Sequence, residues 1–181
     1  MTTEQVAASS IYPSFNDHLR GLLPRKVVVA GDAAWEVART PWVVNVDQQP
    51  RAVVTVTDAI DVVTIVRFAY DCGLTVAAQP GGHGGTRALD DTILLRTRGL
   101  GGIEVDVDAR VARVGAGVKW GELMAALEGT GLTGLVGSTP DTSVVCLSVG
   151  GGISWFGRAY GLAADAWWPS RSSTLMGTWC A

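Results

Sequence analysis

Apolar and polar positions along the first half of the chain predict four strands and one long helix. Between the second and third strands, apolar side chains recur at helical spacing over 58–72, with Thr57 as the cap and Gly73 as the stop. This strand–helix–strand order predicts a βαβ unit whose two strands run parallel. The predicted strands cover residues 27–30, 52–56, 75–78 and 92–96.

In the second half of the chain, apolar and polar residues alternate strictly, which favours antiparallel strands. Residues 103–107 and 110–114 alternate on either side of Asp108 and Ala109, which predicts a hairpin with a two-residue connection and one solvated face. A short helix is expected over 120–127. We therefore expect two lobes, a βαβ lobe to about residue 97 and an antiparallel lobe after it.

Three segments show no clear period. Residues 1–24 are polar and mixed, and we expect a lead-in helix or arm there, whereas 35–50 is expected to be irregular. Residues 134–160 are punctuated by glycine and carry few regular signals. Long loops inside compact domains are usually functional, so this last segment is a candidate binding region.

Composition narrows the class of protein. The 181 residues are 48% apolar and 17% charged, too little charge for a disordered tail or a coiled coil, and the 23 glycines lack the triplet period of collagen. The net charge of −3 comes without a basic stripe, so no nucleic-acid partner is expected. The first twenty residues lack a signal-peptide pattern, and the longest uncharged stretch, 142–157, is too short for a membrane span. We expect a cytoplasmic protein without a membrane partner.

The densest chemical signal is the run PGGHGGT over 80–86, directly after the strand at 75–78. Glycines let the backbone approach a ligand and turn its N–H groups toward an anion such as a pyrophosphate. His83 would then be held against that ligand, although a flexible loop that happens to contain a histidine is an alternative. The candidate residues are Gly81, Gly82, His83, Gly84 and Gly85.

Other familiar site motifs are incomplete in this sequence. The G-x-G-x-x-G fingerprint fails at Arg87 and at Trp120, and neither a P-loop nor a G-x-S-x-G motif occurs. The only histidines are His18 and His83, and the three cysteines share no metal-type spacing, so no metal site is expected.

A second glycine site follows the apolar run 144–149. The consecutive Gly150, Gly151 and Gly152 suggest a backbone packed against something flat or large, and a tight structural crossing of two strands is the alternative.

Together these segments resemble the FAD-binding half of the berberine-bridge-enzyme-like oxidases, which belong to the vanillyl-alcohol-oxidase superfamily with its PCMH-type flavin domain. The resemblance runs in order and in register over about 27–165. It implies a two-lobed α+β flavin domain over 27–165, an N-terminal arm over 1–26, and a chain incomplete at its C-terminus, because the family continues into further strands and a substrate domain. The matching motifs begin with QPGGHGGT at Gln79, DTILLRT at Asp91, VGAGVKWGEL at Val114, GSTPD at Gly137 and VGGGISWFGRAYGLAAD at Val149.

The resemblance also implies the roles of the site residues. His83 matches the histidine that bonds covalently to the 8α-methyl group of FAD, a reaction that needs a neutral imidazole as nucleophile. Some relatives attach the flavin through a cysteine as well, and Thr139 stands at that place, so one covalent bond is expected. Cys146 is expected to be structural. The remaining matches are Gly81, Gly82, Gly84 and Gly85 with the pyrophosphate loop, Ser138, Thr139 and Asp141 with a second cofactor loop, and Gly150, Gly151 and Gly152 with the backbone beside the flavin.

The implied activity is that of an FAD-dependent oxidase. Hydride would pass from an alcohol carbon of a sugar-like or secondary-metabolite substrate to flavin N5, and O2 would reoxidise the flavin. No catalytic residue is assigned. The alternatives are a catalytically inactive remnant or flavin-binding module, and a subunit whose substrate domain is another chain.

The amino-acid composition of the chain changes abruptly after Asp165. Residues 166–181 hold three of the seven tryptophans and no acidic residue. Back-translated with GC-rich codons and read in a shifted frame from Trp167, they give two alternating strands' worth of residues, which resembles the family's continuation. We therefore expect a frameshifted tail, with a natural tail as the alternative.

Overall fold

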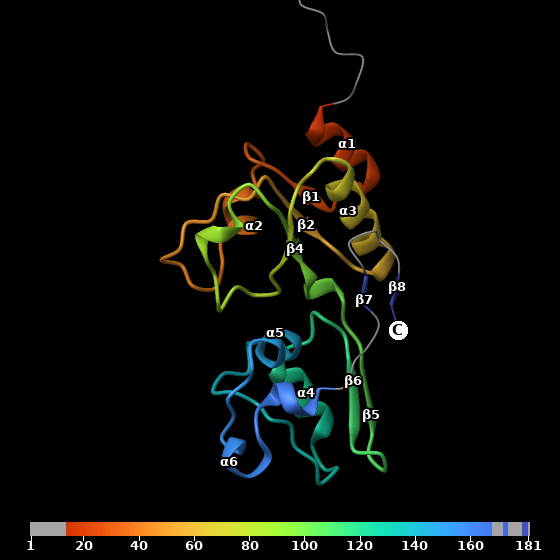
Figure 1. Cartoon of the computed structure of the whole chain (residues 1–181), viewed down its shortest axis with the longest axis vertical. Coiled ribbons are helices and arrows are strands. Elements are labelled where there is room, and N and C mark those ends of the chain that lie inside the picture. Colours follow the sequence, from red (N-terminus) through yellow and green to blue (C-terminus); the bar gives the residue numbers. More distant parts are fainter. Residues whose placement is uncertain (1–13, 168–171, 174–178, 181) are drawn as a thin grey trace, which may run out of the picture.

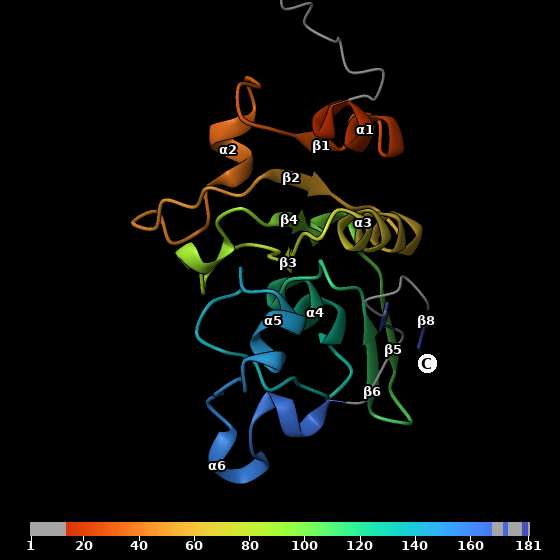
Figure 2. The same cartoon turned by 45° about the horizontal axis from the view of Figure 1, so that its top comes forward.

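The computed structural model describes residues 14–167 and the backbone of two short strands beyond them, 172–173 and 179–180. Two lobes follow one another along the long axis, as Figures 1 and 2 show from two directions. The upper lobe contains α1 (Phe15–Leu22), β1 (Val27–Val28), α2 (Trp35–Arg39), β2 (Ala52–Thr55), α3 (Ala59–Asp71), β3 (Val76–Ala78) and β4 (Ile93–Arg96). The lower lobe contains β5 (Ile103–Asp106), β6 (Val111–Val114), α4 (Trp120–Leu127), α5 (Val144–Val149) and α6 (Gly157–Tyr160), and the last two strands are β7 (Ser172–Ser173) and β8 (Trp179–Cys180).

The upper lobe is built on a four-stranded sheet of order β1-β2-β4-β3. Both β2 and β3 pair with β4 in parallel, so the predicted βαβ unit is confirmed, with β4 between its two strands. β1 pairs antiparallel with β2. The central strands carry apolar side chains on both faces and are almost fully buried, which is typical of a sheet covered on both sides.

Helix α3 begins one residue later than predicted. Its N-cap is Asp58, whose carboxylate accepts the N–H of Asp61 at 2.9 Å, so the prediction of Thr57 as cap is wrong. Thr57 instead donates its own N–H to the Asp61 carboxylate at 2.8 Å. The helix ends as predicted before Gly73, which has a φ of +66°.

Two segments that were expected to be irregular contain short helices. These helices have too few residues to show a helical period in the sequence. Trp35–Arg39 forms α2 inside the segment 35–50, and Val144–Val149 forms α5 inside 134–160. Ser143 caps α5 by accepting the N–H of Cys146 at 3.4 Å. A crossing of two strands at 144–152 is therefore excluded, because the apolar run is helical.

The lower lobe pairs the hairpin β5–β6 with a small helical core. The hairpin is antiparallel as predicted, but the last pair is Asp106 with Val111, so the connection has four residues rather than two. Within it, Asp106 accepts the N–H of Ala109 at 2.9 Å, and Arg110 has a φ of 56°. The core of this lobe consists of Val118, Trp120, Leu123, Leu127 and Val144.

Hydrogen bonds join the two lobes where the chain passes from one to the other. The hydroxyl of Thr97 donates to the carbonyl of Ala116 at 3.2 Å, and Arg98 donates to the carboxylate of Glu122 at 2.5 Å and 2.8 Å. None of the helices in the described residues is long and apolar enough to cross a bilayer.

Candidate functional site: the glycine loops

The loop 80–86 follows β3 and is held by the segment after α2. The N–H of Trp42 donates to the carbonyl of Gly81 at 2.8 Å, and the N–H of Val43 donates to that of Gly82 at 3.3 Å. Gly82 has a φ of +86°, and a Cβ there would lie 2.7 Å from the Cβ of Pro41. Only glycine fits both the conformation and the space, so Pro41 and its neighbours fix the course of the loop.

The imidazole of His83 is half-buried in this loop and stacks on the indole of Trp42. The two ring centroids lie 4.4 Å apart, and the ring planes differ by 12°. The Nε2 atom of His83 is buried and has no hydrogen-bond partner among the described residues. Buried polar atoms are nearly always hydrogen-bonded, so this unpaired nitrogen favours a role in ligand binding over a purely structural one.

Consecutive N–H groups of the loop are free to bind an anion. Within the part of the chain that the structure describes, the N–H groups of Gly81, Gly82, His83 and Gly84 donate to no acceptor. The N–H of Gly85 closes the turn on the carbonyl of Gly82 at 3.1 Å. Successive unpaired N–H groups in a turn can form an anion-binding concavity, and the pyrophosphate role of this loop stays a prediction.

The half-buried side chain of Arg96 ties the start of the loop to the chain beneath it. Arg96 donates to the carbonyls of Ala38 and Thr40, each at 2.8 Å, and to the side-chain oxygen of buried Gln79 at 2.8 Å. Burial lowers the pKa of Arg96 below its ordinary value. Arg96 thus joins the residues before Pro41 to Gln79, directly ahead of the loop.

The second predicted loop, 137–141, lies beside α4 in the lower lobe. The Lys119 ammonium donates to the Asp141 carboxylate at 2.8 Å, and the N–H of Asp141 lies 3.4 Å from the hydroxyl oxygen of Thr139. Lys119 holds the pKa of Asp141 below its usual value. Ser138 is exposed in the same loop.

The glycine triplet packs against the short 3₁₀ helix Ala163–Ala166. Gly152 has a φ of +74°, and a Cβ there would lie 2.5 Å from the Cβ of Ala163. The carbonyls of Gly151 and Gly152 accept the N–H groups of Ala164 and Ala163 at 3.0 and 2.9 Å. Packing within the lobe thus accounts for Gly152, while Gly150 is exposed to solvent.

The family follows from the sequence model that the chain matches. The model described as FAD binding domain matches residues 50–167, well over half of the chain. The chain belongs to the FAD-binding domain family. This family's cofactor is FAD.

Relatives and solved structures agree with this assignment. The (R)-6-hydroxynicotine oxidase of Paenarthrobacter nicotinovorans is 30% identical over 142 residues, which is 77% of this chain and 31% of that protein. An FAD-dependent monooxygenase of Fusarium proliferatum is 34% identical over 120 residues, 65% of this chain and 23% of that protein. The chain spans about a quarter to a third of the length of these relatives.

The fold is that of the PCMH-type flavin domain. The crystal structure of 6-hydroxy-D-nicotine oxidase from Arthrobacter nicotinovorans superposes with a TM-score of 0.79 at 28% identity, covering 88% of this chain and 36% of that one. A variant of the BBE-like protein 1 of Physcomitrella patens superposes with a TM-score of 0.73 at 26% identity, covering 81% of this chain and 34% of that one. The resemblance to berberine-bridge-enzyme-like oxidases and the two-lobed α+β fold are confirmed.

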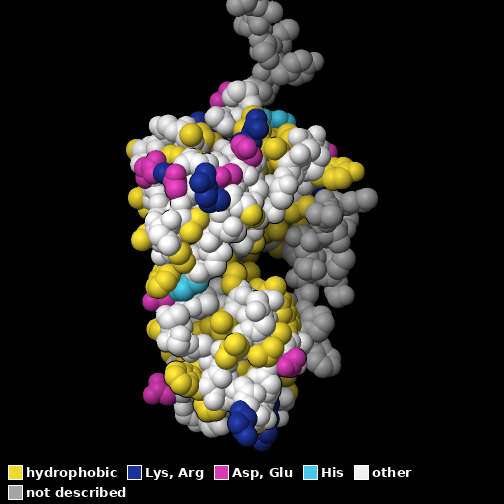
Figure 3. Space-filling view, turned by 60° about the vertical axis from the view of Figure 1, so that its left-hand side comes forward, with side chains coloured by type: hydrophobic (Ala, Val, Ile, Leu, Met, Phe, Trp, Pro, Cys, Tyr) yellow, Lys and Arg dark blue, Asp and Glu magenta, His cyan; other side chains and the backbone are white. Residues whose placement is uncertain are grey.

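The described residues of this FAD-binding domain fit the cofactor. The free N–H groups of 81–84 suit a diphosphate, and the unpaired Nε2 of His83 suits a ligand that approaches the loop. A hollow lies between the lobes and is bordered by apolar side chains (Figure 3), as a flat aromatic ring system requires. Ile153 and Trp155, next to the glycine triplet, are each 81% exposed.

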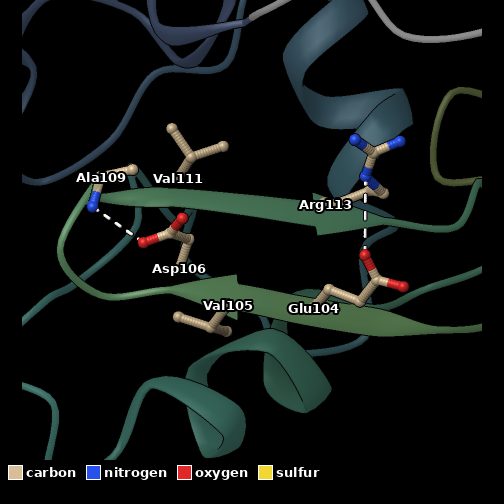
Figure 4. A pocket seen from close by; sticks show the side chains of 6 residues that line it. All are labelled: Glu104, Val105, Asp106, Ala109, Val111 and Arg113. Carbon is tan, nitrogen blue, oxygen red and sulfur yellow. Dashed lines mark hydrogen bonds and ion pairs between the residues drawn. The ribbon is translucent and has the colours of Figure 1, made fainter.

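A second, open pocket on the β5–β6 hairpin contains none of the predicted site residues. Figure 4 shows the side chains that line it, among them Glu104 and Arg113, whose charged groups lie 3.6 Å apart. Both side chains are largely exposed, so their ion pair is weak. No cluster of three potential metal ligands occurs among residues 14–167.

Sequence reasoning missed the residues that support the loops. Trp42 stood in a segment that was expected to be irregular, and Arg96 was interpreted only as a strand residue. Lys119 gave no signal, because its partner Asp141 lies 22 positions away. Cys146, expected to be structural, is exposed on α5, and Cys72 is exposed at the end of α3. The predicted tail over 166–181 lies outside the described residues, apart from Ala166, Trp167 and the backbone of β7 and β8.

Proposed function

We propose that the protein binds FAD with its diphosphate on the free N–H groups of 81–84 and holds it covalently through His83. The observation that carries the proposal is the His83 imidazole, which lies within the glycine loop and has an unpaired, buried Nε2. Most buried polar atoms in folded proteins are hydrogen-bonded, so an unpaired nitrogen is unusual for a histidine that serves only the fold. The family match supports FAD as the ligand of the loop.

The covalent step would join an imidazole nitrogen of His83 to the 8α-methyl carbon of FAD. His83 would give up its imidazole N–H proton and form one C–N bond in place of one C–H bond of the methyl group. This oxidation would release two protons and two electrons in total, and O2 would accept them and leave as hydrogen peroxide. His83 must present a neutral nitrogen lone pair for this attack, and Thr139 offers no thiol for a second bond.

The second loop and the glycine triplet complete the proposed cofactor site within a domain over 27–165. Ser138, Thr139 and Asp141 would contact the cofactor from the lower lobe, where the Lys119 ammonium and the Thr139 hydroxyl hold Asp141 in one loop beside α4. Gly150, Gly151 and Gly152 would lie beside the flavin ring, where the absence of side chains allows close approach.

For the whole protein we propose the oxidation of a small organic substrate at an alcohol carbon, with O2 as the electron acceptor. Bound FAD would supply the hydride chemistry, while the described residues bind and orient it. Relatives named as oxidases and FAD-linked oxidoreductases support this class of reaction, and a sugar-like or secondary-metabolite substrate fits it. The alternative is a flavin-binding module without catalytic activity, and an assay of alcohol oxidation by the flavin-loaded protein distinguishes the two.

The test is to produce the chain in a bacterial host, purify it, and precipitate it with acid. We expect wild-type protein to keep yellow flavin in the pellet, because an 8α-histidyl bond survives acid. His83→Ala should lose this colour, and His18→Ala, which removes the other histidine of the chain, should retain it. Acid-stable flavin in His83→Ala would contradict the proposal, as would wild-type protein that binds no flavin. Wild-type protein that binds and keeps flavin but oxidises no alcohol would favour the module.

A further inference from the structure

We infer that Trp42 is a positioning residue that sets the plane of the His83 imidazole for its bond to the cofactor. The inference rests on the proposed function, because it assigns to Trp42 the task of presenting the nucleophile. Its basis is the parallel stack of the two rings, with centroids 4.4 Å apart and planes 12° from parallel. Trp42 lies outside residues 50–167, which the family model matches.

The stack is the contact that can orient the imidazole. The terminal torsion of histidine is broad, so a ring without hydrogen bonds turns easily about its Cβ–Cγ bond. The His83 side chain makes no hydrogen bond to the described residues, and its Nε2 is unpaired. A flat indole against one imidazole face removes this freedom while leaving the ring nitrogens unbonded, as a nucleophile requires.

Trp42 is itself held in place by its backbone rather than by burial. Its side chain is 60% exposed, so it contributes little to either hydrophobic core. Its N–H is bonded to the carbonyl of Gly81 at 2.8 Å, and Pro41 before it packs on Gly82. The carbonyl of Thr40 accepts from Arg96 at 2.8 Å. The Trp42 indole that stacks on His83 is therefore fixed to the same loop that carries the histidine.

An exposed aromatic residue elsewhere on the surface provides the control for this inference. Tyr70 on α3 offers a matched case, because it is a similarly exposed aromatic residue, at 65%, away from the glycine loops. Truncating Tyr70 removes an exposed ring without touching His83, which makes Tyr70→Ala the control for Trp42→Ala. Trp42→Phe keeps an aromatic face and tests rescue.

The first measurement needs no flavin. In the cofactor-free protein, long-range ¹H–¹⁵N NMR spectra resolve the imidazole protons of His18 and His83. We expect Trp42→Ala to move the His83 resonances out of the indole ring current and to leave the His18 resonances in place. Trp42→Phe should give an intermediate shift, and Tyr70→Ala none at the His83 ring. Unchanged His83 resonances in Trp42→Ala would overturn the inference even if the protein binds FAD covalently.

The second measurement follows covalent attachment after FAD is added to cofactor-free protein. An aromatic contact of this kind predicts that Trp42→Ala slows attachment about 2- to 10-fold, with little change in the Kd of FAD before the bond forms. Trp42→Phe should recover most of the rate, and Tyr70→Ala should match wild type. Attachment at the wild-type rate in Trp42→Ala would overturn the positioning role. If wild-type protein forms no covalent bond, the proposed function fails, and the NMR shifts alone decide whether Trp42 orients His83.

Discussion

Two glycines in the His83 loop, only two positions apart, should respond oppositely to the same substitution. Gly82 has a φ of +86°, and an alanine Cβ there would lie 2.7 Å from the Cβ and 2.9 Å from the Cα of Pro41. Gly84 has no positive φ, and no atom lies within 4 Å of the position of its Cβ. The left-handed conformation costs about 1–2 kcal/mol with a side chain, and overpacking adds about 1–3 kcal/mol.

Gly82→Ala should therefore lower the free energy of unfolding by about 2–5 kcal/mol, since Pro41 is rigid and cannot yield as a flexible side chain would. Gly84→Ala should change it by less than about 1 kcal/mol, and in the stabilising direction, because alanine reduces the freedom of the unfolded chain. Urea denaturation of cofactor-free protein, followed by tryptophan fluorescence, measures both. With ordinary urea dependence, the Gly82→Ala midpoint falls by about 1–2 M. Equal midpoints for the two variants would refute the described course of the loop.

Three further substitutions test contacts that hold the upper lobe and its junction. Arg96→Met should lower the free energy of unfolding by about 2–4 kcal/mol in urea, because the half-buried carbonyl of Ala38 and the buried side-chain oxygen of Gln79 lose their donor; a loss near zero would contradict its bridging role. Burial acts to raise the pKa of Asp61, but hydrogen bonds from Lys26 and from the N–H and hydroxyl of Thr57 together lower it below its ordinary value, so their stabilisation is present above pH 3.8 and is lost as pH falls through the lower folded value. Asp61→Asn should be less stable than wild type by about 2–3 kcal/mol at pH 7, and the gap should close in acid. Arg98 lowers the pKa of Glu122 to about 2, so Glu122→Gln should flatten the stability–pH curve below pH 4.5, by less than about 1 kcal/mol because the pair is exposed; an unchanged curve would contradict the ion pair.

The pattern of apolar residues was sufficient to predict an element where that element is long or strongly apolar. The apolar spacing of 58–72 and the stop at Gly73 predicted α3 almost to its ends, and the run at 92–96 predicted the buried strand β4. Short helices were missed because five or six residues complete too little of a period, as α2 and α5 show. The cap of α3 was misplaced by one residue, since Thr57 and Asp58 are both good caps and the choice depends on Asp61.

The residues of the candidate site also fall into two groups: those that the local sequence identifies, and those that only the folded chain brings near. Glycine density identified the loop at His83 and the triplet at Gly150, because conformation and close approach are local demands. The residues that support these loops are set by the fold: Arg96 bonds a carbonyl 58 positions away, and Trp42 meets His83 because the chain after α2 is hydrogen-bonded to the glycine loop. No single-sequence pattern encodes such pairs.

Peptide mass spectrometry of the purified wild-type chain tests the central claim most directly. Trypsin cleavage after Arg67 and Arg87 releases residues 68–87, a peptide that contains both His83 and Cys72. The account predicts that this peptide carries the mass of one FAD less two hydrogens, and that its fragments place the addition on His83. The same peptide at its unmodified mass, or with the flavin on Cys72, would contradict it.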